Sequence, residues 1–156
     1  MDTYSRGSVQ QFIEGILDAR GFGVLATQCA GQPHASLIAI TPLLGLRQLV
    51  FATYRNTLKF GNLSGDSRVA VLIDGRGLEG SGRPESGVLT AQGRAGEISG
   101  AERPVALAAL LRRHPDLEAF ARSDGCALVR VTVDAYQCVR AIDDVLWWPV
   151  DPQVCA

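Results

Sequence analysis

Apolar positions repeat with a helical period near the N-terminus and then fall into short runs along most of the chain. The residues that recur at three- and four-residue intervals are Val9, Phe12, Ile13, Ile16 and Leu17. This spacing is typical of one buried face of an α-helix. Ser8 and Gln11 can form a capping box at its start, and Gly21 can end it. The pattern therefore predicts an N-terminal helix that covers a sheet or a core.

Six or seven later segments are short, apolar and rich in β-branched or aromatic residues, which is typical of strands. They are residues 22–28, 33–40, 49–53, 69–74 and 87–98, and two strands within 126–143. Short links without crossover helices join the first three, so we expect antiparallel pairing and exclude a doubly wound nucleotide fold. Pro33 can only begin a strand or lie at a sheet edge. Gly93, inside a strand, indicates a bulge or a close backbone approach.

Helical signals return only after residue 98. Ser99 and Glu102 have the spacing of a capping box, residues 105–111 form an apolar face, and Pro115 ends that helix before a short helical piece at 116–123. Residues 75–87, dense in Gly, Ser, Arg and Glu, predict a mobile loop. The pattern as a whole predicts a mainly β (α+β) protein, a closed or nearly closed antiparallel barrel with peripheral helices. We expect one domain spanning residues 1–156.

Composition excludes several classes of function. The formal net charge is −1 and the pI is about 6.1, so no basic excess indicates nucleic acid or an anionic membrane. The sequence has no long apolar run for a membrane span and no signal-peptide pattern at its N-terminus, which predicts a cytoplasmic protein. Its four cysteines form no C-x-x-C pair or Cys/His cluster, so we expect reduced thiols and no metal site.

The segment 51–74 joins two strand patterns through a short polar stretch with a helix signal. Thr57 can cap that helix, Leu58 and Leu63 can face inward, and Lys59 lies just inside its start. Free backbone N–H groups, the positive end of a helix and an ammonium group together favour a phosphate or a carboxylate. The alternative is an ordinary capped surface helix with one solvated lysine.

Signals for protein-borne catalysis are few. The sequence has no G-x-S-x-G, Walker or H-E-x-x-H motif. Its two histidines are His34, two positions before Ser36 on a predicted strand, and His114, at a helix end where it can complement the helix dipole. A structural role is the simpler reading of both. This scarcity fits a protein whose cofactor carries the chemistry, or one that has no activity.

The order of these segments resembles a known family. The segments FAT-YRNT-L-K-F-G-N-L, R-V-A-V-L-I-D and V-L-T-A-Q-G-R-A are similar to those of the pyridoxamine 5′-phosphate oxidase-like FMN-binding split barrels. The resemblance covers residues 22–143. It implies a six-stranded antiparallel split barrel, a homodimer with FMN at the subunit interface, and flavin redox chemistry on a small-molecule substrate.

The resemblance also implies a set of cofactor-binding residues. Thr57 and Lys59 match the Ser/Thr-x-Lys that holds the FMN phosphate, with Leu58 between them, and Thr53 matches the polar residue that ends the preceding strand. The strand expected to border the isoalloxazine ring consists of Ser36, Leu37, Ile38, Ala39, Ile40 and Thr41. Leu37, Ile38 and Ile40 are expected to supply its apolar walls.

The chain also departs from the family pattern. Members that oxidise pyridoxamine phosphate carry an arginine where this chain has Ser36, a glutamine near Val88 and a tryptophan near Val139. A member of the broader flavin-binding group is therefore expected, rather than a true pyridoxamine phosphate oxidase. The alternatives are a flavin-binding protein without turnover and a haem-binding or haem-degrading relative, with His34 or His114 as the axial ligand. Trp147 and Trp148 predict a core plug or a dimer contact, with flavin stacking as the alternative.

Overall fold

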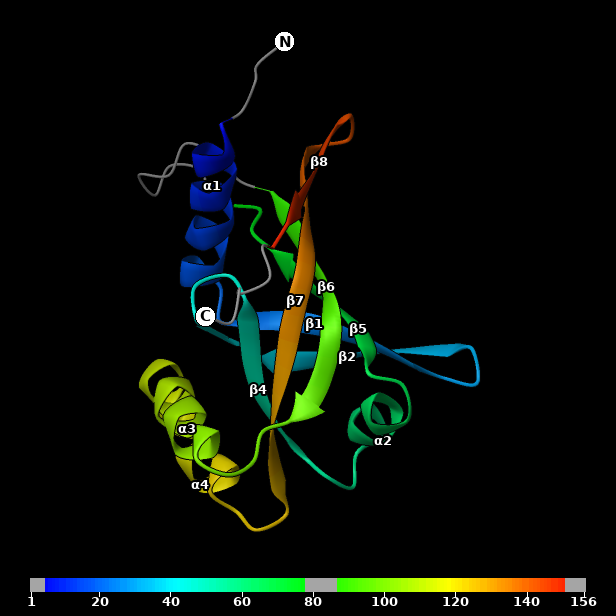
Figure 1. Cartoon of the computed structure of the whole chain (residues 1–156), viewed down its shortest axis with the longest axis vertical. Helices are drawn as coiled ribbons and strands as arrows, with labels where there is room; N and C mark the ends of the chain where they lie inside the picture. Colours follow the sequence, from blue (N-terminus) through cyan, green and yellow to red (C-terminus); the bar gives the residue numbers. More distant parts are fainter. Residues whose placement is uncertain (1–4, 78–86, 151–156) are drawn as a thin grey trace, which may run out of the picture.

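The computed structural model describes residues 5–77 and 87–150 (Figure 1). Strands form the largest share of this part of the chain, and the helices lie outside the sheet. In chain order the elements are α1 (Arg6–Ala19), β1 (Phe22–Cys29), β2 (Gln32–Ala39), β3 (Thr41–Leu43), β4 (Gln48–Tyr54), α2 (Leu58–Gly65), β5 (Arg68–Asp74), β6 (Val88–Glu97), α3 (Glu102–Arg113), a 3₁₀ turn (Pro115–Leu117), α4 (Glu118–Ala121), β7 (Cys126–Ala141) and β8 (Asp144–Pro149).

All strand pairs in the described residues are antiparallel, in the order β2-β1-β5-β6-β7-β4-β3, and β8 pairs with β7. The two ends of this order, β2 and β3, are consecutive in the chain and only Ile40 separates them. The chain therefore curls the sheet round on itself without a closed ladder of strand pairs. The expected mainly β split barrel is confirmed: its six long strands are β1, β2, β4, β5, β6 and β7, and β3 and β8 are short additions.

The sequence pattern divided the last long segment wrongly. We expected two strands within 126–143, but β7 is one continuous strand that pairs with β4, β6 and β8 along different parts of its length. Burial along β7 changes from continuous at its start to alternating further on, as the neighbouring strands change along its length. Trp147 and Trp148 lie in β8, which returns along β7 as the second strand of a hairpin.

Gly93 lies at a bulge and at a close backbone approach, so both expectations are confirmed. The β6–β7 register shifts between Gln92 and Gly93, and a Cβ atom at Gly93 would lie 2.0 Å from the carbonyl oxygen of Thr132. No side chain fits at that distance. Pro33 lies in β2, an edge strand, as expected.

Two of the three predicted helix caps are at other residues. The N-cap of α1 is Ser5, whose Oγ accepts from Ser8 N–H at 3.3 Å, so Ser8 is already inside the helix. The N-cap of α3 is Ala101, without a side-chain hydrogen bond, instead of Ser99. The N-cap of α2 is Thr57, as expected. Capping residues are common just before a helix, so their type alone does not fix which one caps it.

The barrel interior holds the main hydrophobic core. Ile13, Ile16 and Leu17 of α1 lie in it, which confirms the predicted helix face. A second cluster joins α3 to the other side of β4 and β7, through residues such as Leu110, Val50 and Leu128. Most of the predicted 75–87 loop and Cys155 lie outside the described residues. Among the helices that the structure describes, none has the length and apolar character to span a bilayer.

Candidate functional site

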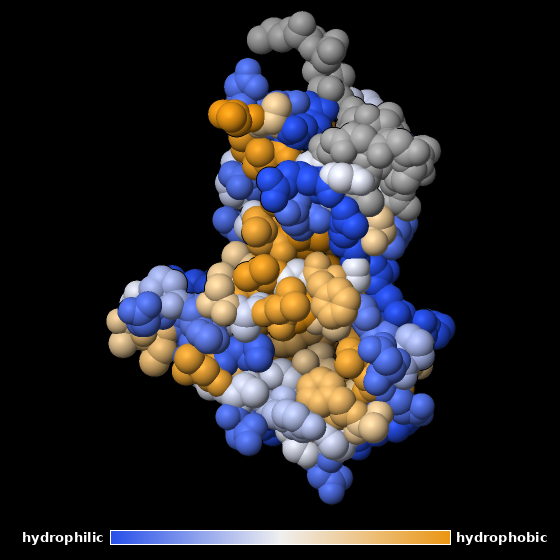
Figure 2. All heavy atoms as spheres, turned by 180° about the vertical axis from the view of Figure 1, so that it is seen from behind, coloured by the Kyte–Doolittle hydropathy of each residue, from blue (hydrophilic) through white to orange (hydrophobic). Residues whose placement is uncertain are grey.

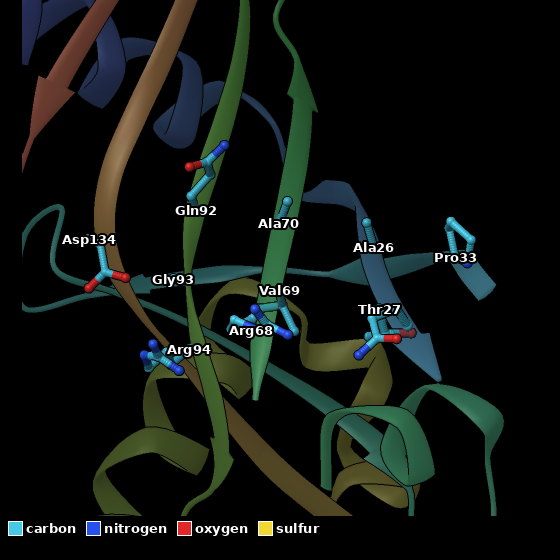
Figure 3. A pocket seen from close by; sticks show the side chains of 11 residues that line it. Ala26, Thr27, Pro33, Arg68, Val69, Ala70, Gln92, Gly93, Arg94 and Asp134 are labelled. Carbon is cyan, nitrogen blue, oxygen red and sulfur yellow. The ribbon is translucent and has the colours of Figure 1, made fainter. Parts of the chain in front are cut away.

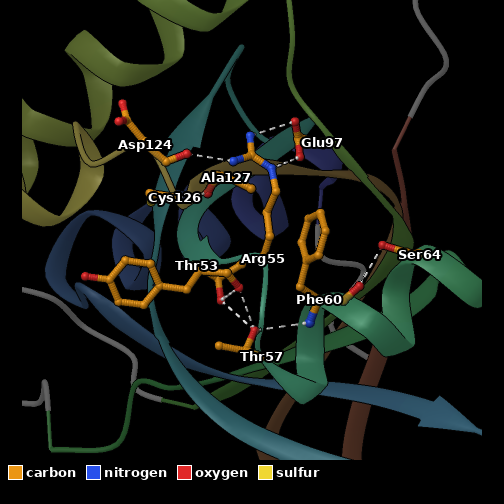
Figure 4. Close-up of polar contacts among 10 residues, drawn as sticks. Thr53, Arg55, Thr57, Phe60, Ser64, Glu97, Asp124, Cys126 and Ala127 are labelled. Atoms are coloured by element: carbon orange, nitrogen blue, oxygen red, sulfur yellow. Dashed lines mark hydrogen bonds and ion pairs between the residues drawn. The ribbon is translucent and has the colours of Figure 1, made fainter.

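The N-terminus of α2 is organised by the hydroxyl of Thr57. Its Oγ1 accepts from the N–H of Phe60 at 3.4 Å and donates to the carbonyl of Tyr54 at 2.9 Å (Figure 4). Thr57 is extended (φ −94°, ψ 154°), the conformation expected of an N-cap. The hydroxyl thus turns the chain from β4 into α2 and fixes the direction of the helix start.

Thr53 supports this cap from the end of β4. Its side chain is buried, and its Oγ1 lies 3.0 Å from Oγ1 of Thr57. Because the hydroxyl of Thr57 is engaged within the protein, the groups left for a ligand at this end are the backbone N–H groups of the first helical turn, which have no partner inside a helix. The structure thus brings Thr53 and Thr57 together at the start of α2.

Lys59 adds the charge at this helix start. It is partly buried, one residue into α2, and it is the only lysine in a sequence that also contains 14 arginines. Leu63 is buried as expected, but the expectation that Leu58 faces inward is wrong, since its side chain is 60% exposed. As the first helical residue, Leu58 lies on the solvent side of the turn, where it can contact a ligand.

Arg55 clamps the turn before α2 to the rest of the barrel. Its Nε and Nη2 donate to the two carboxylate oxygens of Glu97 at 2.9 and 3.1 Å, and Nη1 donates to the carbonyl of Asp124 at 3.0 Å (Figure 4). The hydrogen bond from Arg55 lowers the pKa of Glu97. Sequence reasoning missed this clamp, because Glu97 is 42 positions away and no local pattern connects the two residues.

The strand expected to border the cofactor presents its side chains to two opposite faces. Ile38 and Ile40 point into the core, while Leu37 is 68% exposed on the outer face. These three residues therefore cannot all wall one ring, which corrects that part of the expectation. Ser36 Oγ and Thr41 Oγ1 are buried and have no hydrogen-bond partner in the described residues. Buried hydroxyls are normally satisfied, so these two stand out among the polar groups of this segment.

The two histidines have different surroundings. His114 is buried, its Nε2 lies 2.9 Å from the carbonyl oxygen of Ile40, and its ring packs edge-on to Phe22. Its side chain thus holds the link between β2 and β3 from the C-terminal end of α3. His34 is partly exposed on β2, directly opposite Thr27 of β1, and Thr27 accepts a hydrogen bond from Asn62 of α2. His34 is the histidine that remains open to a ligand.

The tryptophan pair is divided between core and surface. Trp148 packs against the core beside Tyr136, with the Arg6 guanidinium 5.5 Å from its ring centroid. Trp147 is 54% exposed on the other face of β8. One tryptophan therefore fits the predicted core plug, and the other is free for an interface.

Comparison with known proteins gives a family match over most of the chain. A family model described as pyridoxamine 5′-phosphate oxidase matches residues 9–138. No curated protein matches the chain.

Solved structures give the same fold at low sequence identity. A heme binding protein from Mycobacterium smegmatis superposes with a TM-score of 0.79 at 21% identity, over 96% of this chain and 60% of the mycobacterial chain. General stress protein 26 from Bacillus anthracis gives 0.69 at 18% identity, over 91% and 98%. The heme storage protein HutZ from Vibrio cholerae gives 0.66 at 16% identity, over 78% and 87%. At these identities the structural likeness concerns the fold alone.

Proposed function

Since the chain belongs to the pyridoxamine 5′-phosphate oxidase family, we propose that it is an FMN-binding flavoprotein with its phosphate site at the start of α2. The observation that carries the proposal is the Thr57-capped helix start, with the only lysine of the chain beside it. A capped helix N-terminus and an ammonium group are complementary to a phosphate monoester. The unpartnered hydroxyl of Ser36 fits a ligand along the neighbouring β2 strand, which contacts β4.

Each residue has a defined role in this proposal. The backbone N–H groups of Leu58 and Lys59 and the Lys59 ammonium bind the phosphate, and Thr53 and Thr57 hold those groups in place. The edge of the Ser36–Thr41 strand borders the ring. Bound FMN supplies the capacity to take up and release electrons, so the proposed reaction class is oxidation or reduction of a small-molecule substrate.

We propose further that the protein is a homodimer with the flavin at the subunit interface. The supporting observation is an apolar patch on the outer face of β2, β1 and β5, formed by Leu37, Val24, Leu72 and Phe22, whose side chains are 37–68% exposed. Leu37, Val24 and Leu72 lie directly opposite one another across the three strands. Figure 2 shows apolar side chains gathered at the middle of one face. Large exposed apolar patches mark interfaces, and a second copy of the chain is the proposed cover.

A visible spectrum of the purified protein, followed by flavin titrations, tests the proposal. We expect flavin absorption, and FMN should bind far more tightly than riboflavin, which lacks the phosphate. Equal affinity for the two would contradict the role of the α2 helix start. Bleaching by a nicotinamide donor and return of the colour in air would indicate turnover, whereas a flavin that stays oxidised would favour a binding protein without activity.

Haem binding is the second candidate, because two structural relatives are named for heme binding and heme storage. In this chain it depends on His34, since the ring of His114 is buried and bonded to Ile40. A Soret band on addition of haem, lost in His34→Ala and kept in His114→Gln, would favour this candidate over FMN.

A further inference from the structure

A second binding site is suggested by a groove on the outer face of the barrel, away from the start of α2. The groove has a volume of about 500 Å³ and extends over β1, β5 and β6, with Pro33 of β2 and Asp134 of β7 at its ends (Figure 3). None of the residues expected to bind the flavin lines it.

Small side chains hollow out this face. Ala26, Ala70 and Gln92 lie in register across β1, β5 and β6, and the two alanines leave a trough. On one side the trough is bounded by Val24 and Leu72, two positions along the same strands. On the other side it is bounded by two arginines. The floor is therefore apolar and the far wall is basic.

The two arginines lie directly opposite each other. Arg68 of β5 pairs in register with Arg94 of β6, and both side chains are exposed. Like charges at directly opposite positions of an antiparallel pair destabilise a sheet, so an anion between them would stabilise this one. Guanidinium groups also match the geometry of carboxylate and phosphate oxygens.

The guanidinium of Arg68 is held in place by an ion pair. Its Nε and Nη2 donate to the carboxylate of Asp66, with the shortest contact at 2.6 Å, and Asp66 also accepts from the Gln28 amide at 2.6 Å. Within the described residues, Arg94 donates a long hydrogen bond, 3.5 Å from its Nη1 to Ser67 Oγ. One guanidinium is thus fixed, and the other is free to close on a ligand.

Two acidic groups, Asp66 and Asp134, accompany the two arginines at this end of the groove. Asp66 is committed to Arg68 and Gln28. Asp134 lies on β7, two strands away from Arg68, which corresponds to about 10 Å at the usual strand spacing. Its carboxylate weakens the positive field at Arg94, and Asp66 already offsets that of Arg68, so the proposed anion would be held by guanidinium N–H groups and not by an excess of positive charge.

We propose that this groove binds a small oxyanion attached to an apolar body, an organic phosphate or carboxylate, with the oxyanion between Arg68 and Arg94 and the body on Ala26 and Ala70. The apolar floor explains why an organic anion is preferred to an inorganic one. None of the residues proposed to bind the flavin lines the groove, although Val24 and Leu72 at its edge belong to the patch proposed to bind a second copy of the chain.

Titration of the full chain followed by amide NMR tests the proposal, with phenyl phosphate, benzoate, inorganic phosphate and phenol as probes. We expect phenyl phosphate or benzoate to shift the amides of Ala70, Gly93 and Arg94, inorganic phosphate to bind more weakly, and phenol not to bind. The stronger of the two aromatic anions identifies the preferred oxyanion. Equal binding of phenol, or shifts confined to the amides of Leu58 and Lys59, would overturn the proposal.

Four variants sharpen the test. Arg94→Gln should weaken binding by about tenfold or more, as expected for a lost charge-assisted contact. Asp134→Asn should tighten it, because a repelling carboxylate is removed. Arg76→Gln is the control. Arg76 forms an ion pair with Asp74, two residues before it, as Arg68 does with Asp66, but it does not line the groove. An unchanged affinity in Arg94→Gln would contradict the site. Lys59→Ala should leave the groove unaffected, so the two proposals fail independently.

Discussion

At the scale of single residues, Thr57 and Lys59 have complementary roles at the start of α2. The hydroxyl of Thr57 is engaged by Tyr54, Phe60 and Thr53, so it orients the helix, while Lys59 supplies charge. An orienting residue and a charged residue respond differently to substitution, and this difference separates a built anion site from a capped surface helix.

Lys59→Ala should lower the affinity for FMN by tenfold or more, because a charge-assisted contact contributes about 1.5–3 kcal/mol. Lys59→Arg keeps the charge and should retain much of the affinity. Flavin retained through dialysis by the alanine variant as firmly as by the parent would refute the phosphate assignment. Since Lys59 is the only lysine, protection of its amine from acetylation by FMN gives a second, site-specific readout.

Thr57→Ala should lower both the free energy of unfolding and the affinity for FMN. Loss of an N-cap hydroxyl costs about 0.5–2 kcal/mol, and here it also releases the helix start. Thr57→Ser keeps the hydroxyl and serves as the control. Chemical denaturation and flavin titration of the two variants measure these effects. An alanine variant as stable as the serine variant would show that the cap contributes little to the free energy of unfolding.

The cysteines should differ in reactivity. Cys29 is exposed, whereas Cys126 and Cys138 are buried, and burial raises the pKa of Cys138 to about 11. Only Cys29 of these three should be alkylated in the native protein at neutral pH. Mass spectrometry of a Cys155→Ser variant measures this, with unfolded protein as the control. Labelling of Cys138 at a comparable rate would mean that the barrel opens readily.

At the scale of elements, the Arg55–Glu97 clamp joins the β4–α2 turn to the end of β6. Arg55 also donates to the carbonyl of Asp124, and its own N–H donates to the carbonyl of Gly125, so three segments meet at one side chain. Tyr54 packs edge-on against Phe120 of α4 next to it. The position of the α2 start therefore depends on contacts made outside β4 and α2.

The clamp should make stability depend on pH in the acid range. The pKa of Glu97 is lower in the folded protein than its ordinary 4.5, mainly through the hydrogen bond from Arg55. The stabilisation is therefore fully present above pH 4.5 and is lost as the pH falls through the folded pKa of Glu97. Unfolding curves of Glu97→Gln should show less loss of stability below pH 4.5 than the parent. Identical pH profiles would show that the pair is screened by solvent.

At the scale of the whole molecule, the outer face of the sheet is where we propose that a second copy of the chain binds. Its apolar patch is formed by strands whose opposite faces fill the core, so the barrel itself cannot bury it. The groove with Arg68 and Arg94 adjoins this patch along β1 and β5.

Leu37→Glu should dissociate the proposed dimer and release flavin, because the charge would be buried without a partner. Leu44→Glu, at an exposed leucine in the turn after β3, is the matched control and should remain dimeric. Sedimentation equilibrium of dilute, flavin-loaded protein measures both. A parent protein that is a monomer and keeps its flavin would refute the dimer and the interfacial site together.

The sequence by itself determined the local elements and the family. The spacing in α1, the hairpin of β1 and β2, the Thr57 cap and the glycine bulge all depend on residues close together in the chain, where period, propensity and sterics act directly. Local signals failed where two serines close together in the chain can each cap a helix, as with Ser5 and Ser8 at the start of α1.

Only the tertiary structure decided which distant residues meet. The Arg55–Glu97 clamp, the bond between His114 and Ile40 and the opposition of Arg68 and Arg94 depend on strand register and on helix docking. The single strand β7, and the fact that Ile38 and not Leu37 faces the core, follow in the same way from which neighbours cover each strand. Register is set by the packing of the whole barrel, and a shift of one residue would turn every side chain to the other face, so no local segment contains it.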